Sequence, residues 1–182
     1  MESMSTHGAS SSCSERERKR KRTSSSSSAS TSGWKYEVFL SFYGKDTRKS
    51  FTDHLYAALK RKSILTFRDD EKLQRGKCIA PELLKAIQES IYGIIVISPN
   101  YVSSKWCLME LVEIFKCMGE KDTILPVFYH VLPSTVREQR NTFAKAFDKH
   151  EKDPEVDMEQ IQTWKDALTK VANTSGWDLQ DG

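Results

Sequence analysis

The sequence lacks any long uninterrupted run of apolar residues, and this absence argues against two classes of protein. No stretch approaches the roughly 20 apolar residues that a membrane helix needs, and the N-terminus lacks the apolar segment of a secretory signal. The four cysteines form no Cys-x-x-Cys pair, and no cluster of histidines accompanies them. This pattern is typical of a reduced intracellular protein without a metal site. We therefore expect a soluble protein of the cytoplasm, with the nucleus as an alternative, and no membrane partner.

Residues 1–33 lack Trp, Tyr, Phe, Leu, Ile and Val altogether. Serine dominates this segment, which also holds six basic and three acidic residues. So little apolar surface cannot offset the entropy of ordering, and we predict a disordered, Ser-rich basic tail followed by a folded domain at 34–180.

The net charge of +3 belongs to this tail, because residues 34–182 carry equal numbers of basic and acidic residues. A balanced domain gives no electrostatic reason for nucleic-acid binding. For the basic tail, a nuclear address, a phosphate-attracting arm and a merely solvated segment remain open.

From Trp34 onwards, the chain contains apolar runs that alternate with amphipathic segments. Apolar runs predict strands at 36–42, 63–67, 93–98, 123–129 and, as a short last strand, 176–179. Apolar residues at three- and four-residue steps predict helices between them. Such alternation implies right-handed crossovers and a parallel five-stranded sheet in the doubly wound order 2-1-3-4-5, with helices on both faces.

Three local features carry expectations of their own. Asp46 or Thr47 is a candidate cap for the helix that carries Phe51. Pro126 is unfavourable inside a sheet unless its strand lies toward the edge. Residues 133–147 are expected to form one helical stretch.

The segment from residue 93 to residue 118 combines a central strand with an unusual helix. Ser103 and Ser104 both offer N-cap hydroxyls to a helix that opens at about Lys105. Trp106 and Glu110 are four residues apart, so they lie one above the other on a flank beside the apolar stripe. Taken alone, such a carboxylate is more often a solvated side chain than a functional one.

The strand order brings this helix close to the first loop of the domain. Strands one and three are neighbours at the switch point of the sheet, where α/β proteins bind ligands. The loops after these strands then open on one crevice. We expect Gly44 and Arg48 to face Trp106 and Glu110.

Six motifs follow one another in a fixed order along residues 38–137. They are Val38-Phe39-Leu40-Ser41-Phe42-x-Gly44-x-Asp46-Thr47-Arg48, Phe51-Thr52-Asp53-His54-Leu55, Phe67-Arg68-Asp69-Asp70, Ile79-x-Pro81-Glu82-Leu83, Trp106-Cys107-Leu108-x-Glu110-Leu111 and Phe128-Tyr129-x-Val131-x-Pro133-Ser134-x-Val136-Arg137. Together they closely resemble the TIR (Toll/interleukin-receptor) domain of plant immune receptors and TIR-only proteins. The resemblance covers nearly all of residues 34–180 and implies a flavodoxin-like fold.

The resemblance implies hydrolysis of NAD or NADP at the bond between nicotinamide and ribose, with release of nucleotide immune signals. NAD is then a substrate, and neither a cofactor nor a metal is implied. By resemblance Glu110 is the catalytic residue and Trp106 walls the ribose or nicotinamide. Gly44 allows close backbone approach, and Arg48 neutralises a phosphate.

The resemblance also assigns residues outside this group. Arg68 and Asp69 begin the loop that covers the site in the family. His54, Gly176 and Trp177 belong to surfaces through which TIR domains associate with one another. A packed Trp beside a glycine turn is the alternative interpretation of the last two residues.

Among the departures from the family pattern, two concern activity and assembly. Tyr43-Gly44-Lys45 stands where the family usually has Arg-Gly-Glu, which removes a phosphate-facing guanidinium. The sequence stops at Gly182, before the final helix that usually follows Gly-Trp-Asp-Leu, so we expect that helix to be missing. Two functions remain open: an NAD-cleaving enzyme that acts on self-association, or an interaction module that pairs with other TIR domains.

Overall fold

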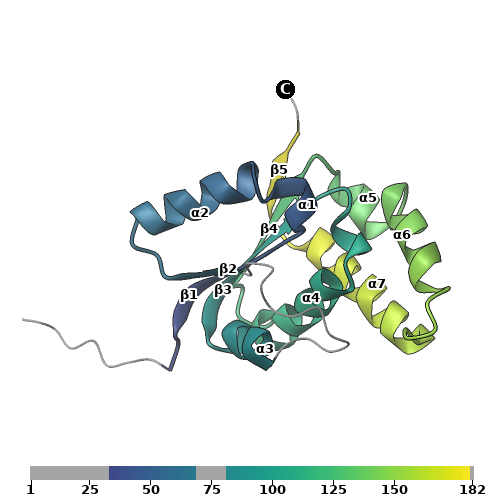
Figure 1. The fold of residues 1–182 in the computed structure, drawn as a ribbon, viewed down its shortest axis with the longest axis horizontal. Coiled ribbons are helices and arrows are strands. Elements are labelled where there is room, and N and C mark those ends of the chain that lie inside the picture. The colour runs from purple at the N-terminus through teal and green to yellow at the C-terminus, as the bar shows by residue number, and fades with distance from the viewer. Residues whose placement is uncertain (1–32, 69–80, 181–182) are drawn as a thin grey trace, which may run out of the picture. The chain divides into compact units, whose positions relative to one another are not determined.

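The computed structural model describes residues 33–68 and 81–180. Most of the predicted tail, residues 1–32, lies outside the described residues. The elements, in chain order, are β1 (Tyr36–Phe42), α1 (Gly44–Thr47), α2 (Phe51–Arg61), β2 (Thr66–Arg68), α3 (Pro81–Gln88), β3 (Ser90–Ile97), the 3-10 helix η1 (Tyr101–Ser103), α4 (Lys105–Met118), β4 (Ile124–Tyr129), α5 (Pro133–Arg137), α6 (Thr142–His150), α7 (Met158–Asn173) and β5 (Trp177–Leu179) (Figure 1). None of the helices described is both long enough and apolar enough to cross a membrane.

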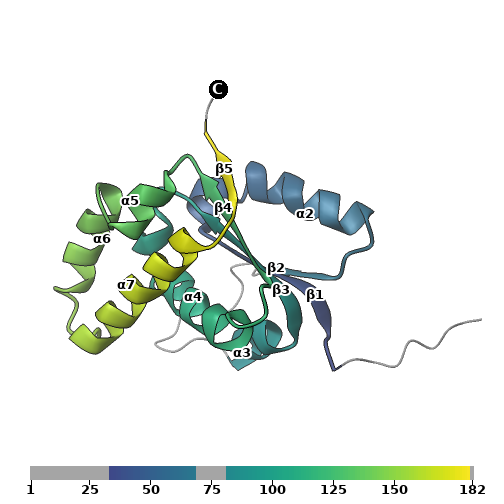
Figure 2. The ribbon, with the colours of Figure 1, turned by 180° about the vertical axis from the view of Figure 1, so that it is seen from behind.

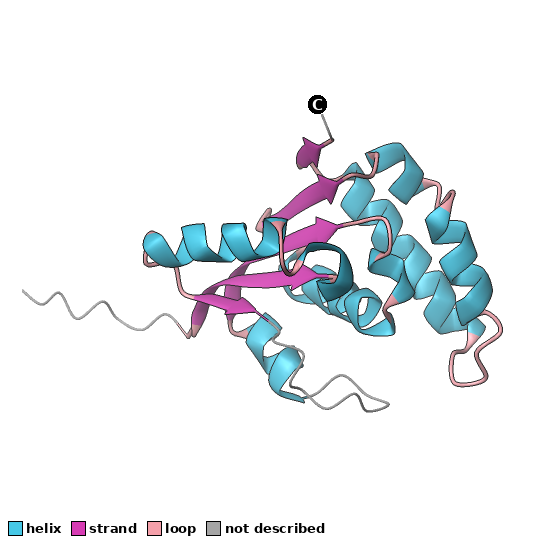
Figure 3. Ribbon diagram, turned by 45° about the horizontal axis from the view of Figure 1, so that its top comes forward, coloured by secondary structure: helices cyan, strands magenta, loops and turns pink. Residues whose placement is uncertain are grey.

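The five strands form one sheet in the order β2-β1-β3-β4-β5. Every neighbouring pair is parallel, which confirms the predicted fold class and strand order. Figure 3 shows the strands in magenta between the helices in cyan. The carboxyl ends of β1 and β3 therefore lie side by side, as a doubly wound sheet requires.

Two buried clusters lie on opposite faces of this sheet, because successive residues of a strand point to opposite sides. Val38, Leu40 and Phe42 of β1 belong to the smaller cluster, which α2 covers. Phe39 belongs to the larger cluster, which is built mainly from α3, α4, α6 and α7. Figures 1 and 2 show α2 on one side of the sheet and α3, α4 and α7 on the other.

The region after β1 differs from the prediction, because two helices replace one. α1 ends at Thr47, and Ser50 has φ −134° and ψ −110°, outside helical geometry. Neither Asp46 nor Thr47 caps α2, whose N-terminus has no side-chain cap. The Asp46 carboxylate instead accepts hydrogen bonds from Asn100, a contact that sequence spacing does not reveal.

The stretch that begins at Pro133 also divides into two helices, α5 and α6. Gln139 and Asn141 between them have φ of 46° and 58°, which no right-handed helix contains. The Gln139 side-chain amide donates to the backbone oxygen of Arg137 at 2.8 Å, next to the end of α5. This local bond satisfies an acceptor that a continued helix would have used.

Pro126 lies in β4, which is the second strand from the edge of the sheet. It pairs with Ile95 of β3. The pairing of β4 with β5 covers only Val127 to Tyr129, so Pro126 has no paired residue in β5. A residue without an N–H is therefore tolerated at this position.

The α2 face of the sheet carries an apolar groove with a volume of about 300 Å³. Its lining consists of Phe51, Leu55, Ile94, Leu125, Val127, Trp177 and Leu179. The groove lies between α2 and β5, the last strand of the sheet.

Candidate active site

The loops after β1 and β3 are joined by a two-bond contact at the predicted switch point. The Asn100 backbone N–H and side-chain amide donate to the two oxygens of Asp46, at 2.9 and 3.1 Å. The Cys107 thiol of α4 approaches the backbone oxygen of Phe42 at 3.6 Å. These contacts confirm that both loops open at one edge of the sheet.

Glu110 is buried at this edge, with only 4% of its surface exposed. The Ser41 hydroxyl, near the end of β1, donates to Oε2 of Glu110 across 2.6 Å. This distance is typical of a hydrogen bond from a hydroxyl to an ionised carboxylate. The interpretation of Glu110 as a solvated side chain is therefore wrong, because the residue faces the sheet and not the solvent.

Tyr101 is a second buried hydroxyl close to this carboxylate. Its hydroxyl lies 2.9 Å from Ser41 Oγ and donates to the backbone oxygen of Cys107 at 3.0 Å. Burial raises the pKa of Tyr101 well above its ordinary value, and the nearby Cys107 thiol and Glu110 carboxylate raise it further. Tyr101 is therefore a protonated donor throughout the physiological range.

Sequence reasoning assigned no role to Ser41 or Tyr101. One signal was present, since Ser41 is the only polar residue in the run from Val38 to Phe42. Its partner on α4 could not be identified before the strands and helices were placed in space.

The start of α4 is fixed by Ser104. Of the two serines that the sequence offered, Ser104 is the N-cap, and its hydroxyl accepts from the Cys107 backbone N–H at 3.4 Å. Trp106 is partly buried and packs against the larger cluster. Trp106 and Glu110 thus lie on successive turns of one anchored helix.

Gly44 and Arg48 lie at the same edge of the sheet, at the two ends of α1. Gly44 is the first residue of that helix, and Arg48 follows its last residue. The Arg48 guanidinium lies 4.8 Å from the centroid of the Phe42 ring. Because Phe42 is the last residue of β1, this contact keeps Arg48 close to the end of that strand.

Arg68 lies on the other face of the sheet from Glu110. It pairs in register with Leu40, which belongs to the cluster beneath α2. Its guanidinium contacts Asp53 at 2.7 Å and lies 4.3 Å from the Tyr56 ring centroid, both on α2. The structure therefore does not bring Arg68 to Glu110. Asp69 lies outside the described residues.

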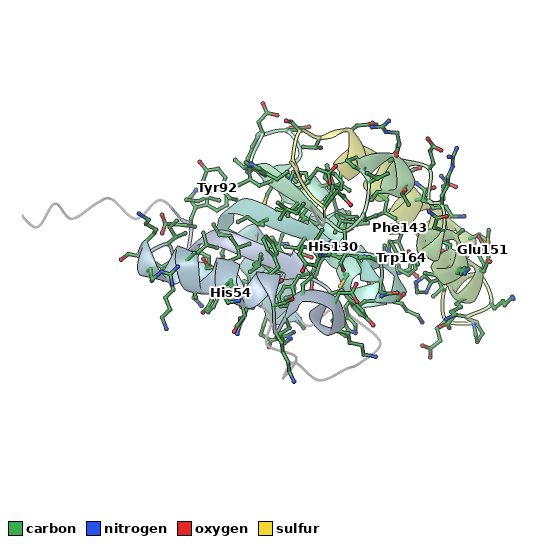
Figure 4. All side chains as sticks on the ribbon, turned by 90° about the horizontal axis from the view of Figure 1, so that it is seen from above. His54, Tyr92, His130, Phe143, Glu151 and Trp164 are labelled. Atoms are coloured by element: carbon green, nitrogen blue, oxygen red, sulfur yellow. The ribbon has the colours of Figure 1, made fainter. Side chains whose placement is uncertain are left out.

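The residues predicted for self-association are all exposed. His54 lies on α2, on the side of the sheet away from Phe143 and Trp164 (Figure 4). Trp177 is 56% exposed, so the alternative of a packed Trp is wrong. At position 176 there is a separate structural reason for a glycine. A Cβ at this position would lie 2.5 Å from the Pro126 backbone oxygen.

Within residues 33–68 and 81–180, no group of three or more His, Cys, Asp or Glu side chains could hold a metal ion. Among the described residues, the Ser41 hydroxyl donates to Glu110, and the Tyr101 hydroxyl lies next to that of Ser41.

The fold and this site define a doubly wound α/β domain with a buried carboxylate at the switch point of its sheet. A family model described as the TIR domain matches residues 35–182. This chain belongs to the TIR domain family.

Among its relatives are plant disease resistance proteins. The TMV resistance protein N of Nicotiana glutinosa is 53% identical over 147 residues, which cover 80% of this chain and 13% of that protein. The disease resistance protein RUN1 of Vitis rotundifolia is 54% identical over 151 residues, which cover 81% of this chain and 11% of that protein. The chain thus spans about a tenth of the length of these curated relatives.

A solved structure is similar to this chain in both fold and sequence. It contains the TIR domains of the activated Roq1 resistosome, which directly recognises the pathogen effector XopQ. The TM-score is 0.70 with 52% sequence identity, over 79% of this chain and 87% of that one.

Proposed function

We propose that this domain hydrolyses NAD, or NADP, at the bond between nicotinamide and ribose. The observation that carries the proposal is the position of Glu110. Its carboxylate is buried at the switch point, where α/β sheets bind ligands, and Ser41 holds it from the neighbouring strand.

The chemistry of NAD explains how one carboxylate suffices. Glycoside hydrolysis normally needs an acid to protonate a poor leaving group, beside a second carboxylate. Nicotinamide in NAD is already cationic. When its bond to ribose breaks, the electron pair neutralises the ring and no acid is required. Glu110 then stabilises the positive charge that develops on the ribose until water adds to it and loses a proton to the solvent.

The neighbouring residues take supporting roles in this proposal. Trp106, one turn before Glu110, offers an aromatic wall to the ribose or nicotinamide. Gly44 allows the substrate to approach the backbone of α1, and Arg48 pairs with a phosphate. We assign Arg68 no direct contact with substrate, because Asp53 and Tyr56 hold it on the opposite face.

Replacement of Glu110 by Gln tests the proposal directly. Glu110→Gln keeps the shape of the side chain and the acceptor for Ser41 but removes the negative charge. We expect release of nicotinamide from NAD by concentrated protein to fall by about 100-fold or more.

Glu113→Gln is the matched control, since Glu113 lies on the same helix and its described partners are Lys116, Gln88 and Cys117. It should stay within about twofold of the wild type. Equal rates from wild type and Glu110→Gln, or no release from the wild type, would exclude the proposed enzyme.

Self-association is the second part of the proposal. We infer that this domain pairs with other TIR domains to signal in plant defence, and that cleavage proceeds in the assembled state. The similarity to TIR domains of a resistosome and the exposed positions of His54 and Trp177 support this part. An interaction module without turnover is the alternative, and it would keep association while losing nicotinamide release.

A further inference from the structure

Two fully buried hydroxyl groups lie beside Glu110, and the proposed reaction does not itself consume either of them. Ser41 is 1% exposed and Tyr101 is 0% exposed. Ser41 comes from β1, Tyr101 from η1, and Glu110 from α4. Three elements on both sides of the switch point therefore meet at one carboxylate.

The number of hydroxyl protons determines the direction of these bonds. An ionised carboxylate can only accept, so Ser41 uses its single proton for the 2.6 Å bond to Glu110. The 2.9 Å contact between Ser41 and Tyr101 must then be donated by Tyr101. Tyr101 shares its proton between Ser41 Oγ and the backbone oxygen of Cys107. The donors thus point from Tyr101 through Ser41 to Glu110.

This arrangement restrains the terminal torsion of the Glu110 side chain. The terminal carboxylate of a glutamate has a broad torsional preference, and packing alone does not fix its orientation. The bond from Ser41 fixes one carboxylate oxygen relative to β1. The Tyr101 hydroxyl also donates to the backbone oxygen of Cys107. This bond ties Tyr101 to the helix that carries Glu110, at a residue three positions before it.

We propose that Ser41 and Tyr101 are positioning residues that orient the Glu110 carboxylate for the transition state. This inference rests on the proposed cleavage of NAD. Ser41 acts directly on Glu110, and Tyr101 acts through Ser41. Because preorganised charge stabilises a transition state more than a bound substrate, loss of either hydroxyl lowers kcat with little change in KM.

Steady-state kinetics of nicotinamide release on the 182-residue chain test this inference. Ser41→Ala should lower kcat by about 10- to 100-fold, the loss expected for a hydrogen bond to a charged group, with KM changed less than about threefold. Tyr101→Phe should lower kcat by about two- to tenfold, since it acts one bond farther away.

Ser98→Ala is the matched control. Ser98 follows β3, the strand beside β1, and is 0% exposed. Among the described residues its hydroxyl has no hydrogen-bond partner. It should keep kcat within about twofold of the wild type. A kcat for Ser41→Ala equal to that of Ser98→Ala would overturn the positioning role while the proposed function stood.

A measurement without turnover separates the two proposals. Urea unfolding midpoints of Ser41→Ala, Glu110→Ala and the double variant form a double-mutant cycle. We expect the midpoint shift of the double variant to be smaller than the sum of the single shifts, because each single change already removes the same bond between Ser41 and Glu110. Additive shifts would overturn the contact itself. A wild type without nicotinamide release but with coupled shifts would overturn the catalytic proposal and leave Ser41 a purely structural partner.

Discussion

Tyr101 illustrates at the scale of single residues how burial and function are combined in this domain. Its ring is fully buried in the larger cluster, while its hydroxyl bonds Ser41 and the backbone of Cys107. A tyrosine that could ionise here would place a negative charge beside Glu110. Burial prevents this, since it raises the pKa of Tyr101 well above the ordinary value.

The stability of the domain should therefore depend on Tyr101 at alkaline pH. Above pH 10, the ordinary pKa of tyrosine, the unfolded chain releases this proton while the folded chain keeps it. The unfolded state then binds fewer protons, so the free energy of unfolding falls as pH rises, by at most about 1.4 kcal/mol per pH unit from this residue. Below pH 10, the stabilisation that Tyr101 contributes through its raised pKa is fully present.

Urea unfolding of the wild type, Tyr101→Phe and Tyr92→Phe at pH 8 to 11 measures this dependence. Tyr101→Phe should lose stability at pH 8 but show a shallower decline above pH 10 than the wild type. Tyr92, which is 42% exposed, provides the control and should keep the wild-type decline. An identical decline in all three proteins would contradict the account of Tyr101.

At the scale of elements, α4 is the helix on which the site depends. Its buried side chains Cys107, Leu108, Leu111, Ile114 and Met118 fix it against the sheet. Its first turn is held by the Ser104 cap and by an ion pair between Lys105 and Asp153 at 2.5 Å. Lys105 lowers the pKa of the Asp153 carboxyl through this contact. The cap and the ion pair set the position of Trp106 and, one turn later, Glu110.

Ser104→Ala should lower the free energy of unfolding by about 1 kcal/mol, the usual cost of losing an N-cap. Ser103→Ala changes the neighbouring serine, which is exposed and not the cap, and should stay within about 0.5 kcal/mol of the wild type. Thermal or urea unfolding of the two variants measures the difference. If Ser104→Ala and Ser103→Ala lowered the free energy of unfolding equally, the cap at Ser104 would make no specific contribution to stability.

At the scale of the whole molecule, exposed aromatic and polar residues of α2 and β5 are candidates for contact with another copy. Trp177 belongs to β5 and also lines the apolar groove beside α2. His54 lies on the exposed side of α2. Large exposed aromatics of this kind commonly dominate the energy of an interface.

We expect the chain to associate with itself in a concentration-dependent way. Trp177→Ala and His54→Ala should each weaken association, with the Trp change raising the dissociation constant by about tenfold. Trp34→Ala is the control, because Trp34 is an exposed tryptophan outside these elements, with 40% exposure. Light scattering over a range of protein concentrations gives the comparison. A monomer at every concentration, or equal weakening by Trp34→Ala, would argue against these surfaces.

The sequence by itself determined the class of the fold and the order of its strands. Continuous apolar runs identify buried parallel strands, and the chirality of crossovers leaves few arrangements for them. The N-cap pair before α4 and the four-residue spacing of Trp106 and Glu110 depend only on near neighbours in the chain. Such features are local, and local physics predicts them.

Only the tertiary structure decided which residues surround Glu110 and which lie elsewhere. Ser41 and Tyr101 reach this carboxylate from other elements, while Arg68 turns to the opposite face because it is in register with Leu40. The bond between Asp46 and Asn100 likewise joins residues that are 54 positions apart. Contacts between distant residues depend on the register of strands and the packing of helices, and no spacing within a single segment encodes them.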